Sequence, residues 1–429
     1  MNKMKSLFSS LLFLGFLFSA AWAVAKPPFK YVWGIAHHIL PETHSDESGY
    51  FSLCEGNNGR IYVGTAKYNH NAYLVEFDPV TAQQRIVVDA HKICGLNAKG
   101  YAAQAKFHTR NYVGHSGVIY AGTKQGYRKK GDDSKYLGGY LITYNPRNNT
   151  AHNLGMPYKK QGIADVVADE SRGLAYVVTC EDQHWMLYDF ATKKFTELGP
   201  MLTPYATTLM DAEGKAHSLT KDFHLVTYDP ATKKVAQRPI EIGGKPFVRE
   251  NGSSIPTWNL AADGRTAWLI LMNDASLISI DLSSRGKKVK GANHGLMLEG
   301  KRPDSRSALT IAPDGKIYTL ISVQNTTGFG KGKLHHLCQY DSKKRRHEDL
   351  GVLAVKNPDF FDFNPANGKK PPKSHGYHTL PDGTMTPLHN HMALVATRDN
   401  TLYATIIYPF TLLKIDAYRQ EPPAPAEKY

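Results

Sequence analysis

The sequence predicts an all-β protein, a seven-bladed β-propeller whose ring is closed by an N-terminal strand that completes the last blade. Three observations support this prediction: one repeating unit occurs seven times, its strands alternate or run apolar between turn residues, and long amphipathic helical periodicity is absent. Four-stranded units repeated in this way suit a propeller, because arranging the blades in a ring protects the strand edges.

The repeating unit is a strand, a turn rich in Asp, Asn and Gly, a second strand, a variable loop, and a third strand that ends in an aromatic residue or Ile followed by Asp or Asn. The seven units span residues 50–81, 105–150, 166–194, 205–234, 258–284, 308–344 and 391–419. The last unit offers only three clear strands. We therefore expect FKYVWGIA, residues 29–36, to supply its outer strand.

The propeller is expected over residues 26–419, between a signal peptide at residues 1–25 and a Pro-rich tail at residues 420–429. Lys3 and Lys5 precede an apolar run that ends in small residues, which is typical of a signal peptide and predicts a secreted or periplasmic protein. No cysteine follows that run and no later stretch is long and apolar enough to span a bilayer, so no membrane anchor is expected.

The chain is basic, with a formal net charge of +14 that becomes +12 once Lys3 and Lys5 are removed. Such an excess attracts a polyanion and steers its approach. Outside the cell it favours an acidic polysaccharide as the partner over nucleic acid, although many exported proteins are simply basic. The four cysteines are widely spaced, and one disulfide, such as Cys54 to Cys94, would suit an oxidising compartment.

One face of the predicted ring gathers most of the histidines and cations of the repeats. In a propeller, the start of each innermost strand and the loop between the second and third strands open on the same face, around the central channel. The candidate substrate-binding residues near these positions are Lys106, Arg110, Lys124, Arg128, Trp185, Lys221, His224 and Arg306. Trp185 could stack on a sugar ring, or equally be a core residue.

His108, Tyr127 and His184 are the candidate catalytic residues on this face. His108 is flanked on its own side by Lys106 and Arg110, which favour the neutral imidazole and so suit a general base. The alternative for His108 is a structural histidine that binds a neighbouring blade.

His389 and His391 begin the strand of the last unit and lie two residues apart, so both imidazoles point to one side. With a third ligand from another blade, or from His375 or His378 in the preceding insertion, they could hold one divalent metal ion such as zinc, calcium or manganese. Substrate contact, catalysis and a structural role remain the alternatives.

The segments AKFHTR, GVIYAGTKQGY, GGYLITYNPR and YVVTCEDQHWMLYD together resemble exported seven-bladed polysaccharide lyases of the ulvan lyase type. Such lyases use histidine and tyrosine for proton transfer, and arginine or histidine to neutralise the uronate carboxylate. The resemblance implies that His108 matches the first family histidine. The second family histidine falls near Tyr127, and Cys180 and Glu181 lie where the family tyrosine is expected.

The resemblance implies β-elimination on a uronate-containing acidic polysaccharide, with a sulfated, ulvan-like polysaccharide among the candidates. The carboxylate must be neutralised before a base removes the neighbouring proton, and Arg128, Lys106 or a metal could supply the charge. His108 or Tyr127 would take the proton, and His184 or a tyrosine would return one. The alternative is a non-catalytic propeller that binds acidic glycan or a protein partner.

Overall fold

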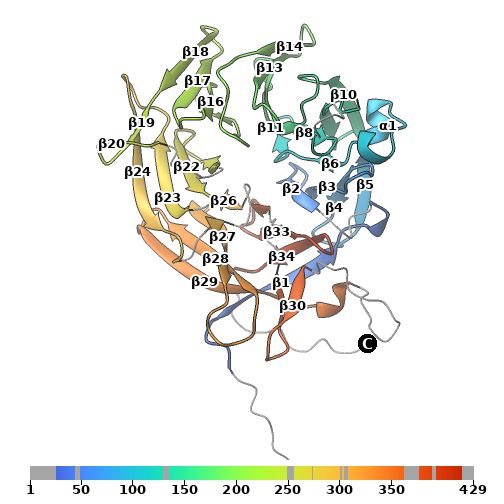
Figure 1. Ribbon diagram of the computed structural model, residues 1–429, viewed down its shortest axis with the longest axis vertical. Coiled ribbons are helices and arrows are strands. Elements are labelled where there is room, and N and C mark those ends of the chain that lie inside the picture. The colour runs from blue at the N-terminus through green and yellow to red at the C-terminus, as the bar shows by residue number, and fades with distance from the viewer. Residues whose placement is uncertain are drawn as a thin grey trace, which may run out of the picture.

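The computed structural model describes residues 26–43, 49–128, 135–248, 256–272, 274–299, 302–303, 308–361, 376–388 and 393–417. Within these residues the strands form seven blades, arranged as a ring in Figure 1. The predicted all-β propeller is therefore confirmed. The predicted signal peptide and the Pro-rich tail lie outside the described residues.

Each blade is an antiparallel sheet whose strands follow one another from the centre of the ring outward. Blade one contains β2 (Gly49–Glu55), β3 (Ile61–Thr65), β4 (Tyr73–Phe77) and β5 (Gln84–Asp89). Blade two contains β6 (Lys106–Phe107), β7 (Tyr112–Val113), β8 (Ile119–Lys124), β9 (Leu141–Asn145) and β10 (Thr150–Gly155). Blade three contains β11 (Ile163–Asp169), β12 (Leu174–Thr179), β13 (Trp185–Asp189) and β14 (Lys194–Glu197). Blade four contains β15 (Leu209–Met210), β16 (Ala216–Leu219), β17 (Leu225–Asp229) and β18 (Lys234–Arg238).

The remaining blades carry additions to the repeating unit. Blade five contains β21 (Pro256–Leu260), β22 (Thr266–Leu271), β23 (Asp274–Asp281) and β24 (Val289–Leu296), extended by β19 (Ile240–Ile242) and β20 (Lys245–Pro246). Blade six contains β25 (Arg302–Pro303), β26 (Leu309–Ile311), β27 (Lys316–Gln324), β28 (Lys333–Asp341) and β29 (Arg346–Val355). Blade seven contains β32 (Leu394–Ala396), β33 (Leu402–Ile406), β34 (Thr411–Ile415) and β1 (Tyr31–His38). The insertion before blade seven forms the hairpin β30 (Tyr377–Thr379) and β31 (Met385–Pro387).

Helices are short. The longest in the described part of the chain is α1 (Ala90–Cys94), which begins where the Asp89 side chain accepts a hydrogen bond from the Lys92 amide. The 3-10 turns are η1 (Pro41–Thr43), η2 (Gly100–Ala102) and η3 (Pro358–Phe360). None of the helices in the described residues is long and apolar enough to cross a membrane.

Neighbouring blades pack face to face through separate apolar clusters. Leu53, Tyr403 and Phe410 belong to the cluster between blades seven and one, for example, and all three are buried. Because successive side chains of a strand point to opposite faces of its sheet, a strand between two other blades buries both faces. This explains why the strands run apolar, as β3 and β33 do.

The N-terminal strand closes the ring as predicted, since β1 pairs antiparallel with β34, Gly34 opposite Ile415 and His38 opposite Thr411. Its first half also pairs parallel with β29, Tyr31 opposite Val352. This second pairing was not predicted. It joins blades six and seven into one sheet, so β1 connects two blades at the point of closure.

Gly34 lies where the two ladders of β1 meet, and we expect Gly34→Ala to weaken the closure. An added Cβ would lie 2.8 Å from Leu413 Cγ and 2.9 Å from the Lys414 carbonyl oxygen, so the backbone would have to shift. The expected loss is about 1–3 kcal/mol in the free energy of unfolding, measured with urea. The neighbouring Ile35→Ala is the control, since Ile35 is exposed and should change stability by less than about 0.5 kcal/mol. Equal stability of the two variants would contradict this account of the closure.

Blade four contains a buried hydrogen-bonded chain from Asp211 through His217 to Thr227. His217 Nε2 lies 2.8 Å from Asp211 Oδ2, and its Nδ1 lies 2.9 Å from Thr227 Oγ1. Burial by itself raises the pKa of Asp211, but the hydrogen bond and charge of His217 outweigh burial and lower that pKa. The chain ties the first turn of the blade to its second and third strands.

We expect Asp211→Asn to cost about 2–3 kcal/mol of unfolding free energy at neutral pH. Because the folded-state pKa of Asp211 is lowered, the stabilisation is present above the unfolded pKa and disappears as the pH falls through the folded pKa. The difference between wild type and variant should therefore shrink below about pH 4, as measured by urea unfolding over a pH series. A difference that stays constant into strong acid would show that the Asp211 charge does not stabilise this blade.

Candidate functional site

In blades two and three, the start of the innermost strand lies beside the end of the second strand, as the propeller geometry predicts. Lys106 at the start of the innermost strand pairs with Lys124 at the end of the second strand, and Ile163 pairs with Thr179 in the same way. The side chains that follow these positions therefore meet at one end of the ring. We call this end, where Tyr68, Lys106, His108, Lys124, Tyr127, Arg128, Tyr136, Cys180, Glu181 and Asp182 come together, the mouth.

Tyr68, Lys106 and Tyr127 form a compact unit at the mouth. The Lys106 ammonium donates a hydrogen bond to Tyr68 Oη at 2.7 Å and lies 4.1 Å from the centre of the Tyr68 ring and 4.9 Å from that of Tyr127. The two rings are stacked with centroids 5.6 Å apart. Lys106 is only 1% exposed, whereas Tyr68 and Tyr127 are 38% and 56% exposed. A buried cation therefore lies behind two exposed aromatic rings.

Lys124 is also buried, and it forms an ion pair with Glu181 of blade three. Tyr136 donates to the same carboxylate at 2.6 Å, and the Gly162 amide donates to its other oxygen at 2.7 Å. Burial alone would lower the pKa of Lys124, but Cys180 and Glu181 outweigh burial and raise it. The pKa of Tyr136 is also raised, by burial and by the Glu181 charge. This network joins blades two and three and fixes the floor of the mouth.

His108 also belongs to the floor and is 2% exposed. Its Nδ1 lies 2.8 Å from the Ile163 carbonyl oxygen and 3.2 Å from Cys180 Sγ. Because a carbonyl oxygen can only accept, the Ile163 contact places a proton on Nδ1. When the imidazole is neutral, Nε2 then holds the lone pair that a general base requires.

Arg128 makes a two-pronged ion pair with Asp182 at the exposed rim, with nitrogen to oxygen distances of 3.1 and 3.2 Å. The hydrogen bonds from Arg128 lower the pKa of Asp182. The guanidinium is thus oriented to hold a carboxylate through two hydrogen bonds, and in this structure that carboxylate belongs to Asp182.

Four other predicted residues lie outside the contacts described so far, although the charge of His184 helps to lower the pKa of Asp182. Trp185 is fully buried and donates to Thr208 Oγ1 at 3.2 Å, which makes it a core residue between blades three and four. His184 stacks on Tyr158 and binds Glu197 of the outermost strand β14. Lys221 and His224 lie in the corresponding loop of blade four, where His224 binds Gln237. The structure does not bring their side chains together with His108.

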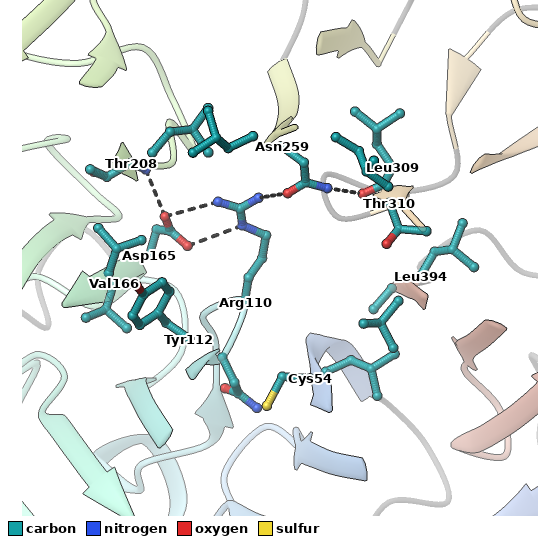
Figure 2. Close-up of a pocket in the computed structure, with 18 of the residues that line it drawn as sticks. Cys54, Arg110, Tyr112, Asp165, Val166, Thr208, Asn259, Leu309, Thr310 and Leu394 are labelled. Carbon is teal, nitrogen blue, oxygen red and sulfur yellow. Dashed lines mark hydrogen bonds and ion pairs between the residues drawn. The ribbon is translucent and has the colours of Figure 1, made fainter. Parts of the chain in front are cut away.

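Arg110, a predicted substrate-binding residue, instead points into the central channel, as Figure 2 shows. Its guanidinium lies 3.4 Å from both oxygens of Asp165 and donates to the Trp258 carbonyl at 2.8 Å and to Asn259 Oδ1 at 2.9 Å. Asp165 is buried, which raises its pKa, although Arg110 opposes the shift. These contacts run from blade two to blades three and five. Arg110 therefore has a structural role, because it links three blades of the ring.

The pocket of Figure 2 has a volume of about 430 Å³ and is lined by the innermost strands of all seven blades. Its walls are largely apolar, with Leu53, Val166 and Leu394 among them. Arg110 is the one cationic side chain among the described residues that line this pocket, where it contacts Asp165 and Asn259.

Arg306, His389 and His391 lie outside the described residues. Among the residues that the structure does describe, no group of three or more His, Cys, Asp and Glu side chains is arranged to hold a metal ion. The divalent metal therefore stays a prediction. The four cysteines are free, so the predicted disulfide between Cys54 and Cys94 is absent from this structure.

Sequence reasoning missed the partners that the cations use. Neither Tyr68 nor Glu181 was recognised as a direct partner of a lysine. Tyr136 lies in a loop between the second and third strands and gave no signal at all. Alternation on the strands indicates a shared face, but it does not indicate which side chains touch across two blades.

Solved structures with the same architecture are known. The structure of U3-55K superposes with a TM-score of 0.51 at 8% sequence identity, covering 86% of this chain and 95% of that chain. The crystal structure of RRP9 WD40 repeats gives a TM-score of 0.49 at 9% identity, covering 86% and 94%. No family model and no curated protein matches the sequence. The chain is thus a β-propeller protein, and likeness at this identity concerns the fold alone.

Proposed function

We propose that this protein is an exported polysaccharide lyase that binds an acidic, uronate-containing polysaccharide at the mouth and cleaves it by β-elimination. The observation that carries the proposal is the exposed pair of stacked rings, Tyr68 and Tyr127, in front of the buried Lys106 ammonium. Aromatic faces stack on the apolar faces of sugar rings, and the positive charge favours an anionic sugar. The basic net charge of the chain supports the same partner.

Arg128 provides the charge that a uronate needs for elimination. Its two-pronged contact with Asp182 is the geometry in which a guanidinium binds a carboxylate, so a uronate at the rim can take the place of Asp182. Neutralising the substrate carboxylate makes the proton on the adjacent carbon more acidic and stabilises the enolate-like transition state.

Tyr68 is the base that the geometry favours, because Tyr68 is 38% exposed while His108 is almost fully buried. The hydrogen bond from Lys106 stabilises negative charge on Tyr68 Oη. The deprotonated oxygen takes the C5 proton of the uronate, the C5–H electron pair forms the C4=C5 double bond, and the C4–O4 bond breaks. Tyr127, whose ring stacks on that of Tyr68, donates a proton to O4.

A non-catalytic glycan-binding propeller is the second candidate. The observation that favours it is that Lys124, Glu181 and Tyr136 satisfy one another, so much of the polar floor is structural. Such a protein would hold the same polysaccharide at the rim without breaking a bond.

Ultraviolet absorbance during incubation with a panel of uronate-containing polysaccharides tests the proposal. The lyase predicts rising absorbance from the new double bond on at least one substrate. A flat trace with retained binding would favour the glycan-binding alternative, and a flat trace without binding would contradict both. Loss of the signal with a chelator would support the metal predicted at His389 and His391.

A further inference from the structure

A second charged groove lies between blades four and five, where β17 and β18 face blade five in Figure 1. It has a volume of about 620 Å³ and we call it the rear groove, defined by Lys215, Lys234, Arg238, Arg265 and Arg285 together with Glu213 and Asp229. Glu213 and Lys215 lie in the turn between β15 and β16 of blade four. This turn is at the end of the blade opposite the mouth. The rear groove is therefore separate from the mouth.

Positive charge dominates the rear groove, with five cationic and two acidic side chains along it. Arg238 donates to the Ser284 carbonyl at 2.6 Å, and Arg265 lies 3.7 Å from Glu213. Lys215, Lys234 and Arg285 form no ion pair with any residue that the structure describes. Three cations on one groove are thus available to an anionic ligand.

The lining favours an acidic glycan over nucleic acid. Thr227, Thr232 and Ser283 also line the groove, where Thr227 contacts His217 and Ser283 donates to Asp281, and their hydroxyl oxygens can accept further hydrogen bonds from sugar hydroxyls. Among the described residues that line the groove there is no Phe, Tyr or Trp, so no platform exists on which bases could stack. A groove lined by several cations suits a polymer that carries an anionic group on successive sugars.

We propose that the rear groove is a second binding site for acidic polysaccharide. It anchors the polysaccharide at a distance from the mouth. The glycan class rests on the proposed function, whereas the site itself rests on the charges of the groove. The groove lacks the exposed tyrosine pair of the mouth, so it binds without cleaving.

The test compares two triple variants with equal charge change. One replaces Lys215, Lys234 and Arg285 with Gln, and the control replaces Lys92, Arg147 and Lys343, which are exposed elsewhere, with Gln. Binding of heparin as the sulfated probe is measured by calorimetry over a series of salt concentrations. The groove variant should bind about tenfold more weakly and with a shallower salt dependence, since fewer counterions are released.

The control variant should bind heparin within about twofold of wild type. Equal weakening of the two variants would overturn the site, because only overall charge would then matter. Tighter binding of single-stranded DNA than of heparin, lost in the groove variant alone, would overturn the glycan class. The ultraviolet assay on a short uronate oligosaccharide separates this proposal from the lyase, because the groove variant should cleave it at the wild-type rate whenever wild type cleaves it.

Discussion

Tyr68→Phe is expected to lower turnover of the uronate substrate by at least about a hundredfold while leaving its binding nearly unchanged. Phenylalanine keeps the ring that stacks on Tyr127 but removes the oxygen that Lys106 contacts at 2.7 Å. The loss should therefore fall on kcat more than on KM, since the hydroxyl acts in the transition state. Initial rates from absorbance, together with calorimetric binding, measure the two effects separately.

His108→Gln is the matched comparison for Tyr68→Phe. Glutamine can still donate to the Ile163 carbonyl, so the floor of the mouth should persist and turnover should stay within about tenfold of wild type. The opposite pattern, with His108→Gln inactive and Tyr68→Phe active, would move the base to His108, as the family resemblance implies. A Tyr68→Phe variant with full turnover would remove Tyr68 from the reaction.

Glu181→Gln is expected to cost about 3–5 kcal/mol of unfolding free energy, because it leaves the Lys124 ammonium buried without a counter-charge. Both side chains are largely excluded from water, at 4% and 9% exposure, so the uncompensated charge cannot be solvated without a rearrangement. Tyr136 and the Gly162 amide would also lose a charged acceptor. Urea unfolding of the variant and wild type gives the difference.

The double variant Glu181→Gln with Lys124→Met shows how much of the lost stability is due to the unpaired charge of Lys124. Removing both charges should recover at least half of the stability lost by Glu181→Gln alone, because no unpaired ion remains. Additive losses in the double variant would show that the two side chains stabilise the interface independently. That result would contradict the ion pair as the link between blades two and three.

The fold could be predicted because its signals are local. Turn residues and alternating strands repeat within each unit, and the missing fourth strand of the last unit pointed to the N-terminus, where β1 does pair with β34. The parallel pairing of β1 with β29 could not be predicted, since it depends on how blades six and seven are placed. The added strands β19 and β20 lie outside the repeating unit and gave no period to follow.

The site could be predicted only in part. Propeller geometry placed Lys106, Lys124 and Tyr127 on one face, and the structure brings all three to the mouth. The sequence did not distinguish two structural residues from the substrate-binding candidates. Arg110 contacts Asp165 in the channel, and Trp185 is buried in the core. Those outcomes depend on side-chain contacts across two or three blades, which no spacing within one strand determines.

The most direct test of the central claim is the mass spectrum of the oligosaccharides released from a uronate-containing polysaccharide. Elimination at the mouth predicts new non-reducing ends that are one water lighter than the products of hydrolysis. These products should disappear with Tyr68→Phe. Products that have gained water, or an unchanged polymer that still binds the protein, would contradict the proposed lyase.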